Sequence, residues 1–496
     1  MSASRRLWTI VGGALLAAAL AVVAARPLFF QDPAPQIHVR WRTPLDAAAR
    51  DALERRFHLV PAEEVGPDIW RYELTDPSRD SVEALVRHPA VADTHYIDRD
   101  TFEIREDAPR ARRRPTPLGE YWPEAAGALV DTGPIVLLLL AAVAARFAVR
   151  PHEAPAIAAF AVRVFTRAIP LISPRTLALF RLVFGLALAW YAFALRLDYI
   201  PLPVARTNVP LAHFALMAWL GQHPSVVHAG LWTAIVSSVL FAAGVLPKVL
   251  YVVSVAGITQ WLLTATLWHS SHPYGVLLLP LVCLIAVPWG DAPPIARFLG
   301  RHPPPAGTPA RRYGYAPWLL SLALGLAWAG AAWAKVGGGP AWVLNGSIRY
   351  HFVTDIEYAP VPWGLTIAAM PNVAVALSAG AVLVEGLLVL AAVLVTAPLL
   401  RLLAGAAALS VLAGFYLFMG LFWPAWWILL LGFLPWQWCD RGGHDGAAAV
   451  AAARVTRGQI WCAAGLALQQ LIVSAVFIDL EPVASRYDMY SRTYPS

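Results

Sequence analysis

Charged residues are few in this sequence. Asp, Glu, Lys and Arg make up 14% of its 496 residues, whereas soluble globular domains contain about 25% charged residues. Hydrophobic residues make up 58%, and many of them form runs long enough to cross a bilayer. The composition therefore excludes a wholly soluble protein and predicts an α-helical, polytopic membrane protein.

Cysteine is scarce as well, and the three cysteines are Cys283, Cys439 and Cys462. All lie in or beside apolar runs and no pair has metal-site spacing, so the sequence predicts neither a disulfide framework nor a metal centre. The net charge of +7 is typical of positive cytoplasmic loops and of contact with anionic membrane lipids. No basic groove interleaved with aromatic residues indicates nucleic-acid binding.

The N-terminal segment, residues 1–28, is predicted to be a transmembrane anchor. Arg5 and Arg6 precede an apolar run from Leu7 to Ala25, which is nearly twenty residues long and can therefore span a bilayer. A cleaved secretory signal is the alternative, because small residues close the run.

With this anchor, about eleven transmembrane helices are predicted. The other ten lie at 128–148, 176–197, 226–246, 249–268, 274–290, 316–334, 373–396, 402–422, 424–438 and 459–479. Residues 402–438 are interpreted as two spans, with one hairpin as the alternative, because Pro424 interrupts them. Residues 128–150 are predicted to form a transmembrane helix, and residues 151–172 an interfacial amphipathic helix. Residues 173–496 are predicted to form a multi-helix membrane domain.

Residues 37–105 differ from the rest because they are rich in charges. Ile37–Trp41 and Ile69–Leu74 alternate polar and apolar residues, which predicts strands. Pro44–Phe57 has the 3.6-residue period of a helix. The resulting β-α-β-(β)-α-β order predicts a small α+β, ferredoxin-like domain. Residues 106–127 follow as a basic, proline-rich linker.

The positions of Lys and Arg in short loops predict the orientation. The N-terminus lies inside, and the 37–105 domain and the C-terminus lie outside. Abundant Ala, Pro and Arg indicate a high-GC bacterial source, so the predicted location is the bacterial inner membrane. The extracytoplasmic domain is then the expected contact site for a protein or peptide partner.

Glu385 is the most informative single residue. It lies well inside an apolar span, where a carboxylate is costly unless it faces the bundle interior. Lys335, Arg181 and tyrosines are its candidate partners, although Arg181 is expected to reach the cytoplasmic surface by snorkelling. Proton relay, substrate binding and a buried bond between helices remain open as roles for Glu385.

Other polar and aromatic residues gather at the predicted outer ends of the spans. The candidate catalytic residues are His269, His272, Lys335 and Glu385, and the candidate ligand-binding residues are Trp268, Trp342, Arg349 and His351. His269 and His272 would share one helical face, but no third ligand lies near them in sequence. Interfacial hydrogen bonding is therefore preferred to metal binding.

The segment from about 173 to 496 resembles a known family, the horizontally transferred transmembrane domain (HTTM), which the vitamin K-dependent gamma-carboxylases share. The resemblance rests on the order of five features along the chain. These are Phe180–Gly185, Trp268–Gly275, Ala329 through Lys335 to Trp342 and Gly346, Glu385, and Tyr487–Tyr494. It implies a helical bundle with an outward-facing pocket for an isoprenoid, quinone or acyl chain.

The chain departs from the carboxylases at a decisive position. They carry a base lysine just ahead of the motif that Trp268 begins, whereas Leu263–Leu267 contains no lysine. Alanine and threonine cannot accept that proton, and the large β-domain of the carboxylases is also missing. Gamma-carboxylation is therefore not expected.

The favoured function is binding of a lipid-like or apolar peptide ligand in an outward-facing pocket, in the maturation or export of a partner. A membrane enzyme acting on a lipid or quinone at the outer leaflet is the first alternative. A proton-coupled transporter is the second, although the chain lacks paired halves with broken helices.

Overall fold

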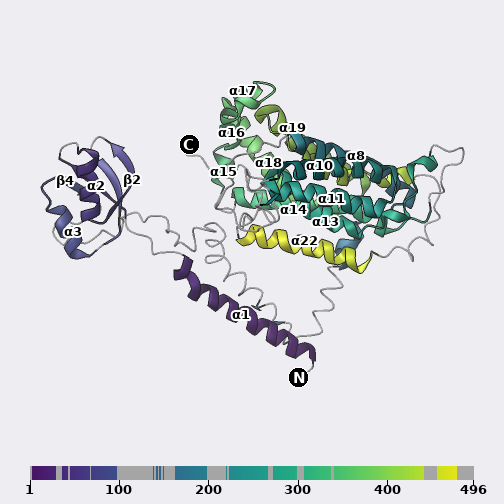
Figure 1. Ribbon diagram of the computed structural model, residues 1–496, viewed down its shortest axis with the longest axis horizontal. Coiled ribbons are helices and arrows are strands. Elements are labelled where there is room, and N and C mark those ends of the chain that lie inside the picture. The colour runs from purple at the N-terminus through teal and green to yellow at the C-terminus, as the bar shows by residue number, and fades with distance from the viewer. Residues whose placement is uncertain are drawn as a thin grey trace. The chain divides into compact units, whose positions relative to one another are not determined.

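The computed structural model is mainly helical and contains one small sheet (Figure 1). The described residues are 3–29, 36–42, 45–66, 69–76, 78–95, 97, 162–197, 219–220, 223–265, 272–298, 307–336, 340–440 and 455–476, with single positions between 138 and 149. The chain forms two compact units, Leu20–Val130 and the remainder. Helix α1 (Ala3–Phe29) includes the boundary between them. The predicted linker 106–127 and the C-terminal tail lie outside the described residues.

Six of the described helices are long and apolar enough to cross a membrane. They are α8 (Pro174–Leu197), α10 (Pro224–Ala243), α11 (Pro247–Ala265), α14 (Arg311–Val336), α18 (Pro371–Leu394) and α19 (Pro398–Met419). Each overlaps a predicted span. Proline at the first helical turn and a left-handed glycine after the last define several of these boundaries, as at Gly244 and Gly420.

Other predicted spans have different structures. Residues 278–298 form two helical pieces bent by 61°. Helix α20 (Pro424–Leu429) continues only as a short 3-10 helix to Phe433, so α19 alone has the length of a span in the 402–438 region. Helix α22 (Arg457–Val476) has 20 residues but is not among the six. The predicted helix at 128–150 lies almost entirely outside the described residues.

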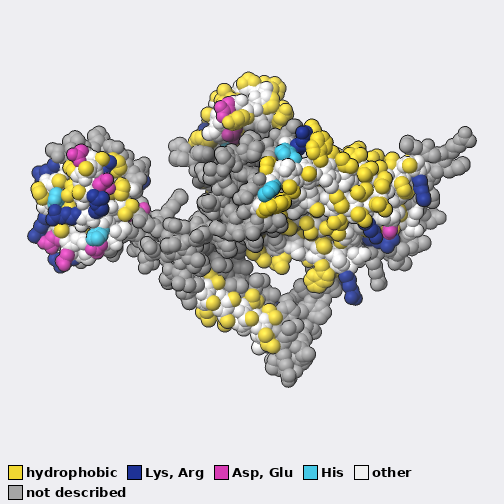
Figure 2. Space-filling model, viewed as in Figure 1, with side chains coloured by type: hydrophobic (Ala, Val, Ile, Leu, Met, Phe, Trp, Pro, Cys, Tyr) yellow, Lys and Arg dark blue, Asp and Glu magenta, His cyan; other side chains and the backbone are white. Residues whose placement is uncertain are grey.

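Side chains on the bundle surface are apolar. Figure 2 shows hydrophobic side chains covering the face that carries α8, α10 and α11. On α10, Trp232 and Val236 are about half exposed. A soluble protein rarely exposes a contiguous apolar surface of this extent, so the surface is that of a multi-pass membrane protein.

Helix α14 is the central helix of the membrane unit. In its most apolar window, 78% of the residues are buried. The Trp318 indole donates to the Ala392 carbonyl at 3.0 Å, and Gly325 packs directly against the α18 backbone at Val389. Trp318 near the start of α14 thus lies beside Ala392 near the end of α18, whereas Lys335 near the end of α14 contacts the earlier Glu385, so the two helices run antiparallel.

Two buried arginines hold irregular segments. Arg181 is 0% exposed and donates to the carbonyls of Trp289, Ala292 and Pro293 at 2.7–3.3 Å. The predicted snorkelling of Arg181 is therefore wrong, because these carbonyls belong to the bent segment and lack helical partners. Arg401 also lies buried, in the first turn of α19.

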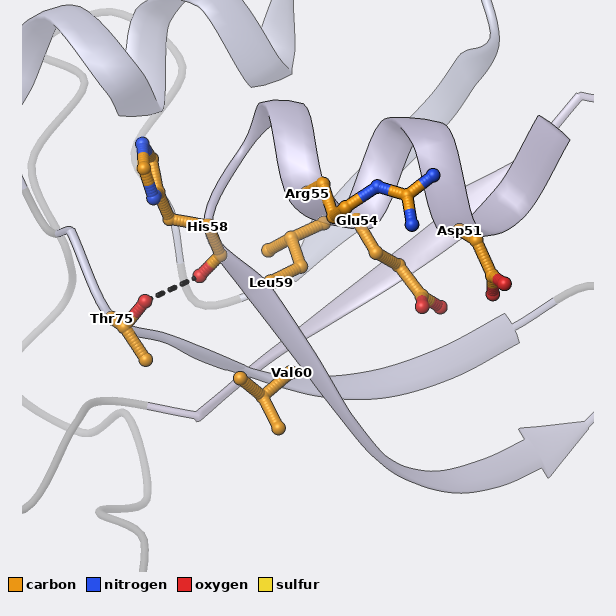
Figure 3. A pocket seen from close by; sticks show the side chains of 7 residues that line it. All are labelled: Asp51, Glu54, Arg55, His58, Leu59, Val60 and Thr75. Carbon is orange, nitrogen blue, oxygen red and sulfur yellow. Dashed lines mark hydrogen bonds between the residues drawn. The ribbon is translucent and has the colours of Figure 1, made fainter. Parts of the chain in front are cut away.

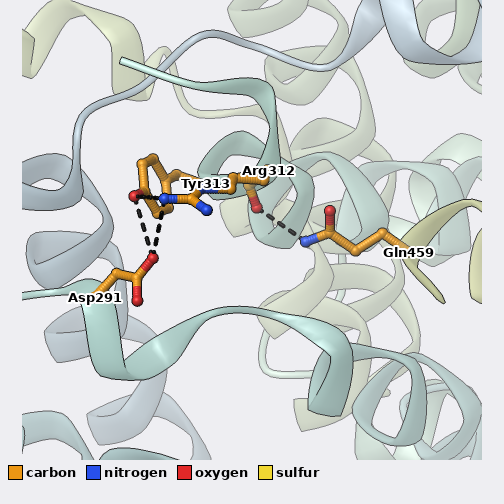
Figure 4. A network of polar contacts seen from close by, with 4 residues as sticks. All are labelled: Asp291, Arg312, Tyr313 and Gln459. Carbon is orange, nitrogen blue, oxygen red and sulfur yellow. Dashed lines mark hydrogen bonds and ion pairs between the residues drawn. The ribbon is translucent and has the colours of Figure 1, made fainter. Parts of the chain in front are cut away.

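A polar network joins the start of α14 to its neighbours (Figure 4). Arg312 forms an ion pair with Asp291 at 3.2 Å, and the Tyr313 hydroxyl donates to the same carboxylate. Gln459 of α22 donates to the Arg312 carbonyl at 3.0 Å. The first turns of α14 and α22 are thus side by side.

The smaller unit contains a four-stranded antiparallel sheet in the order β2-β3-β1-β4. Its elements are β1 (Gln36–Trp41), α2 (Ala47–Arg56), β2 (Leu59–Gly66), β3 (Ile69–Leu74), α3 (Arg79–Val86) and β4 (Val91–His95). Alternate strand residues such as Ile37, Val39 and Tyr72 are fully buried. The period-2 pattern therefore places one face of the sheet in a core of its own.

Glu54 gives this unit a testable pH dependence. Its carboxylate is largely buried on α2, and burial raises its pKa despite a hydrogen bond with Tyr72 and the nearby Arg50. A carboxyl whose pKa is raised in the folded state opposes folding once it ionises. We therefore expect Glu54→Gln to stabilise the smaller unit at pH 7.

The gain should disappear as the pH falls to about 4, where the carboxyl is protonated in both states. Hydrogen exchange of residues 36–97 in the full chain, compared between variant and parent at each pH, measures it. Glu83→Gln, at an exposed ion pair with Arg87, is the control. Equal protection of the Glu54→Gln variant and the parent at pH 7 would contradict this assignment.

Candidate functional site

A buried ion pair joins α14 to α18. Lys335, in the last turn of α14, lies with its Nζ 2.6 Å from each carboxylate oxygen of Glu385. The side chains are 3% and 2% exposed. Burying two charges is tolerated when they pair at hydrogen-bonding distance, so each residue explains the presence of the other within the bundle.

Aromatic residues surround the lysine. The Trp342 ring, on α15 (Ala341–Leu344), lies 5.2 Å from Lys335 Nζ, which is within the range of a cation–π contact. A cavity beside them is lined by Lys335, Trp342, Ile348, His351, Ala381, Phe415 and Met419. Its volume is about 10 Å³, roughly the space that one water molecule needs. In this conformation the cavity can hold one water molecule but no larger ligand.

The structure brings some of the predicted site residues together and leaves others apart. Lys335, Glu385, Trp342 and His351 form one cluster. Arg349, on α16 (Ile348–Thr354), instead contacts the Tyr350 ring and hydroxyl. Trp268 and His269 lie outside the described residues. His272 begins the short α12 (His272–Gly275), and its side chain is not described.

A groove between α14 and α22 was not predicted. Its volume is about 270 Å³. Its lining residues are Leu326, Ala329, Gly330, Trp333, Gln470, Leu471 and Ser474. Small residues on α14 create the groove, because Ala329 and Gly330 leave space that larger side chains would fill. Gln470 donates to Ser474 at 3.4 Å, which adds a polar group to an apolar wall.

A further depression lies in the smaller unit, between α2 and the start of β2 (Figure 3). Its volume is about 360 Å³, and Asp51, Glu54, Arg55 and His58 contribute side chains of both signs. Thr75 donates to the His58 carbonyl at 2.9 Å and holds His58 in a left-handed conformation with φ of 53°. The mixture of charges indicates no single ligand class.

No match was found when the chain was compared with models of protein families, with curated proteins and with solved structures. Among the residues that the structure describes, no three His, Cys, Asp or Glu side chains are close enough to hold a metal ion. The two features of the membrane unit that could carry a function are therefore the Lys335–Glu385 cluster and the α14–α22 groove.

Proposed function

We propose that this protein binds a lipid-like, apolar chain in the groove between α14 and α22. The observation that carries the proposal is the groove itself, about 270 Å³ in volume and walled by aliphatic and aromatic residues. Ligand pockets combine such apolar walls with a few polar groups, and Gln470 with Ser474 supplies those groups here. The ligand is thus an apolar chain that carries a hydrogen-bonding group.

The wider setting of this proposal comes from the sequence. We propose a bacterial inner-membrane protein of about eleven spans, related to HTTM proteins, with an extracytoplasmic ferredoxin-like domain. In that topology the C-terminal halves of α14 and α22 lie in the outer leaflet, and so does the groove. Maturation or export of a partner, contacted through residues 37–105, is the cellular process that suits this arrangement.

The ion pair supports the binding role indirectly. Lys335 lies on the side of α14 that faces α18, whereas Gly330 and Trp333 face α22. The pair therefore fixes one side of the helix whose other side forms the groove wall. The cavity beside Lys335 is too small for the ligand in this conformation.

Filling the groove tests the proposal. We expect Ala329→Phe to reduce the native lipid that co-purifies with the full chain by about tenfold, because the ring occupies the space of the chain. Mass spectrometry of organic extracts measures the retained lipid. Ala379→Phe, at an exposed position of α18, is the matched control and should retain it.

Equal lipid retention by the two variants would refute the groove as the binding site. Enrichment of an apolar peptide instead of a lipid, lost in Ala329→Phe, would keep the site but change the ligand class.

A membrane enzyme is the second candidate. It is favoured because the amine of Lys335 and the imidazole of His351 line one water-sized cavity and the carboxylate of Glu385 contacts that amine, and such groups suit acid–base catalysis. His351→Asn should then abolish conversion of the bound lipid while leaving its retention unchanged. Unchanged lipid composition in cells expressing this variant would exclude the enzyme.

A further inference from the structure

A second apolar hollow lies where α14 and α22 begin. Its volume is about 120 Å³. It is lined by Val162, Phe165, Thr166, Ile169, Tyr315, Trp318, Val455, Gln459, Ile460, Ala463 and Ala464. These residues come from the helical segment 162–168 with Ile169, from the start of α14, and from the start of α22. The hollow is thus at the opposite ends of α14 and α22 from the groove.

Most polar groups in the walls of the hollow have hydrogen-bond partners, whereas the buried Tyr315 hydroxyl has none among the described residues. Thr166 donates to the Val162 carbonyl at 2.7 Å. Gln459 donates to Arg312 and accepts from the Thr456 amide, in a capping box that begins α22. Thr166 and Gln459 are thus bonded to their own neighbours, and the rest of the lining is mainly apolar apart from the Tyr315 hydroxyl.

Hydrogen bonds fix the segment that closes the hollow. Arg311 of α14 donates from Nη1 to the carbonyls of Thr166, Arg167 and Ile169 at 2.7–2.8 Å. Gly314 packs directly against the Pro170 carbonyl. The 162–169 wall is therefore held against α14, and the hollow is a built feature of the bundle.

We call three exposed arginines the arginine border, because each lies within two positions in the sequence of a residue that lines this hollow. Arg163 and Arg167 each follow a lining residue and are four positions apart, so they lie on one face of the segment. Arg457 lies between the lining residues Val455 and Gln459. Among the described residues none of the three has an ion-pair partner, whereas the nearby Arg312 is paired with Asp291.

We infer that this hollow and its arginine border bind an anionic phospholipid. The acyl chain enters the hollow, and the phosphate accepts hydrogen bonds from Arg163, Arg167 and Arg457. Arginine is well suited to phosphate because its planar fork donates two parallel hydrogen bonds. A soluble phosphate would leave the hollow empty, and an apolar peptide would leave three guanidinium groups without a counter-charge.

The predicted topology agrees with this assignment. It places the starts of α14 and α22 on the cytoplasmic side, where basic pockets between helices bind anionic head groups. The inference does not rest on the groove proposal, because the two sites share no lining residue.

Native mass spectrometry of the full chain in detergent tests the inference, with phosphatidylglycerol and phosphatidylcholine of identical acyl chains as probes. We expect phosphatidylglycerol to be retained in preference. Arg167→Gln should reduce that preference about fivefold, and Arg163→Gln with Arg167→Gln about 25-fold, at roughly fivefold for each arginine near the membrane surface. Arg297→Gln, exposed and on the same predicted side, should leave it unchanged.

A second variant tests the chain-binding part separately. Ala464 is exposed and lines the hollow, so Ala464→Phe should abolish the preference for phosphatidylglycerol over phosphatidylcholine without altering the arginines. Equal loss of the preference in Arg297→Gln and Arg167→Gln, or an unchanged preference in Ala464→Phe, would overturn the site. Displacement of the lipid by millimolar glycerol phosphate would also overturn it, because the head group alone would then account for binding.

Discussion

Lys335→Ala is expected to lower the free energy of unfolding of the membrane unit by about 3–5 kcal/mol. The substitution leaves the Glu385 carboxylate buried between α14 and α18 without its cation, and an uncompensated buried charge is among the costliest single defects in a protein. Unfolding in mixed detergent micelles, followed by near-UV circular dichroism, measures the change. Lys248→Ala removes an exposed lysine and should have little effect.

A double variant separates the charge from the packing. Lys335→Met combined with Glu385→Leu removes both charges and keeps similar volumes, so we expect it to recover most of the lost stability. If Lys335→Ala were as stable as Lys248→Ala, the pair could not be a determinant of the fold. If the double variant were as unstable as the single one, packing rather than charge would explain the loss.

Arg401→Met is expected to lower the free energy of unfolding by about 3 kcal/mol. Arg401 donates to the Ala168 carbonyl, the Ser321 hydroxyl and the Gly432 carbonyl at 3.1–3.2 Å. Each buried acceptor that loses its donor costs about 1–3 kcal/mol. The variant no longer has to desolvate the guanidinium charge, and this gain offsets part of the loss. Arg401 therefore joins three parts of the unit that are distant in sequence.

The effect of Arg401→Met should also be local. Amides near Ala168 and Gly432 should exchange faster in the variant, whereas those of α10 should not. Arg401→Lys should recover only part of the stability, because one ammonium group cannot reach three acceptors in fixed directions. If hydrogen exchange in Arg401→Met were accelerated equally across the unit, and no more near Ala168 and Gly432 than elsewhere, the bridging role would be contradicted.

Much of the membrane unit could be predicted from local sequence. The spans that became α8, α10, α11, α14, α18 and α19 were predicted because long apolar runs have few alternatives to a helix in lipid. Proline in the first turn and glycine after the last turn mark several of the helix ends. A partner for Glu385 was also predictable, since a carboxylate in the middle of a span must be compensated, and Lys335 was one of the named candidates.

The buried arginines could not be predicted from sequence. Near the end of a span, a basic residue can equally reach the membrane surface or bond to carbonyls inside the protein. Arg181 bonds inside because residues 289–293 are bent and leave carbonyls without helical donors. The bend at residues 289–293 is a tertiary feature, and nothing in the sequence around Arg181 indicates it.

The groove between α14 and α22 was missed for a related reason. Alanine and glycine are common in membrane helices, so Ala329 and Gly330 are not distinctive alone. The groove exists because α22, more than 100 residues later in the chain, lies parallel to α14. Side-by-side packing of segments so far apart cannot be deduced from periodicity.

The separation of 50 residues between Lys335 and Glu385 bears on how the protein is inserted during synthesis. Lys335 leaves the ribosome first and lies at the end of its helix, where its long side chain can reach the lipid head groups. Glu385 follows in the middle of the next long helix, where its short side chain cannot reach the head groups. Lys335 is thus synthesised before Glu385, which depends on it. When α18 enters the bilayer, it can pack directly against an α14 that already carries the partner lysine.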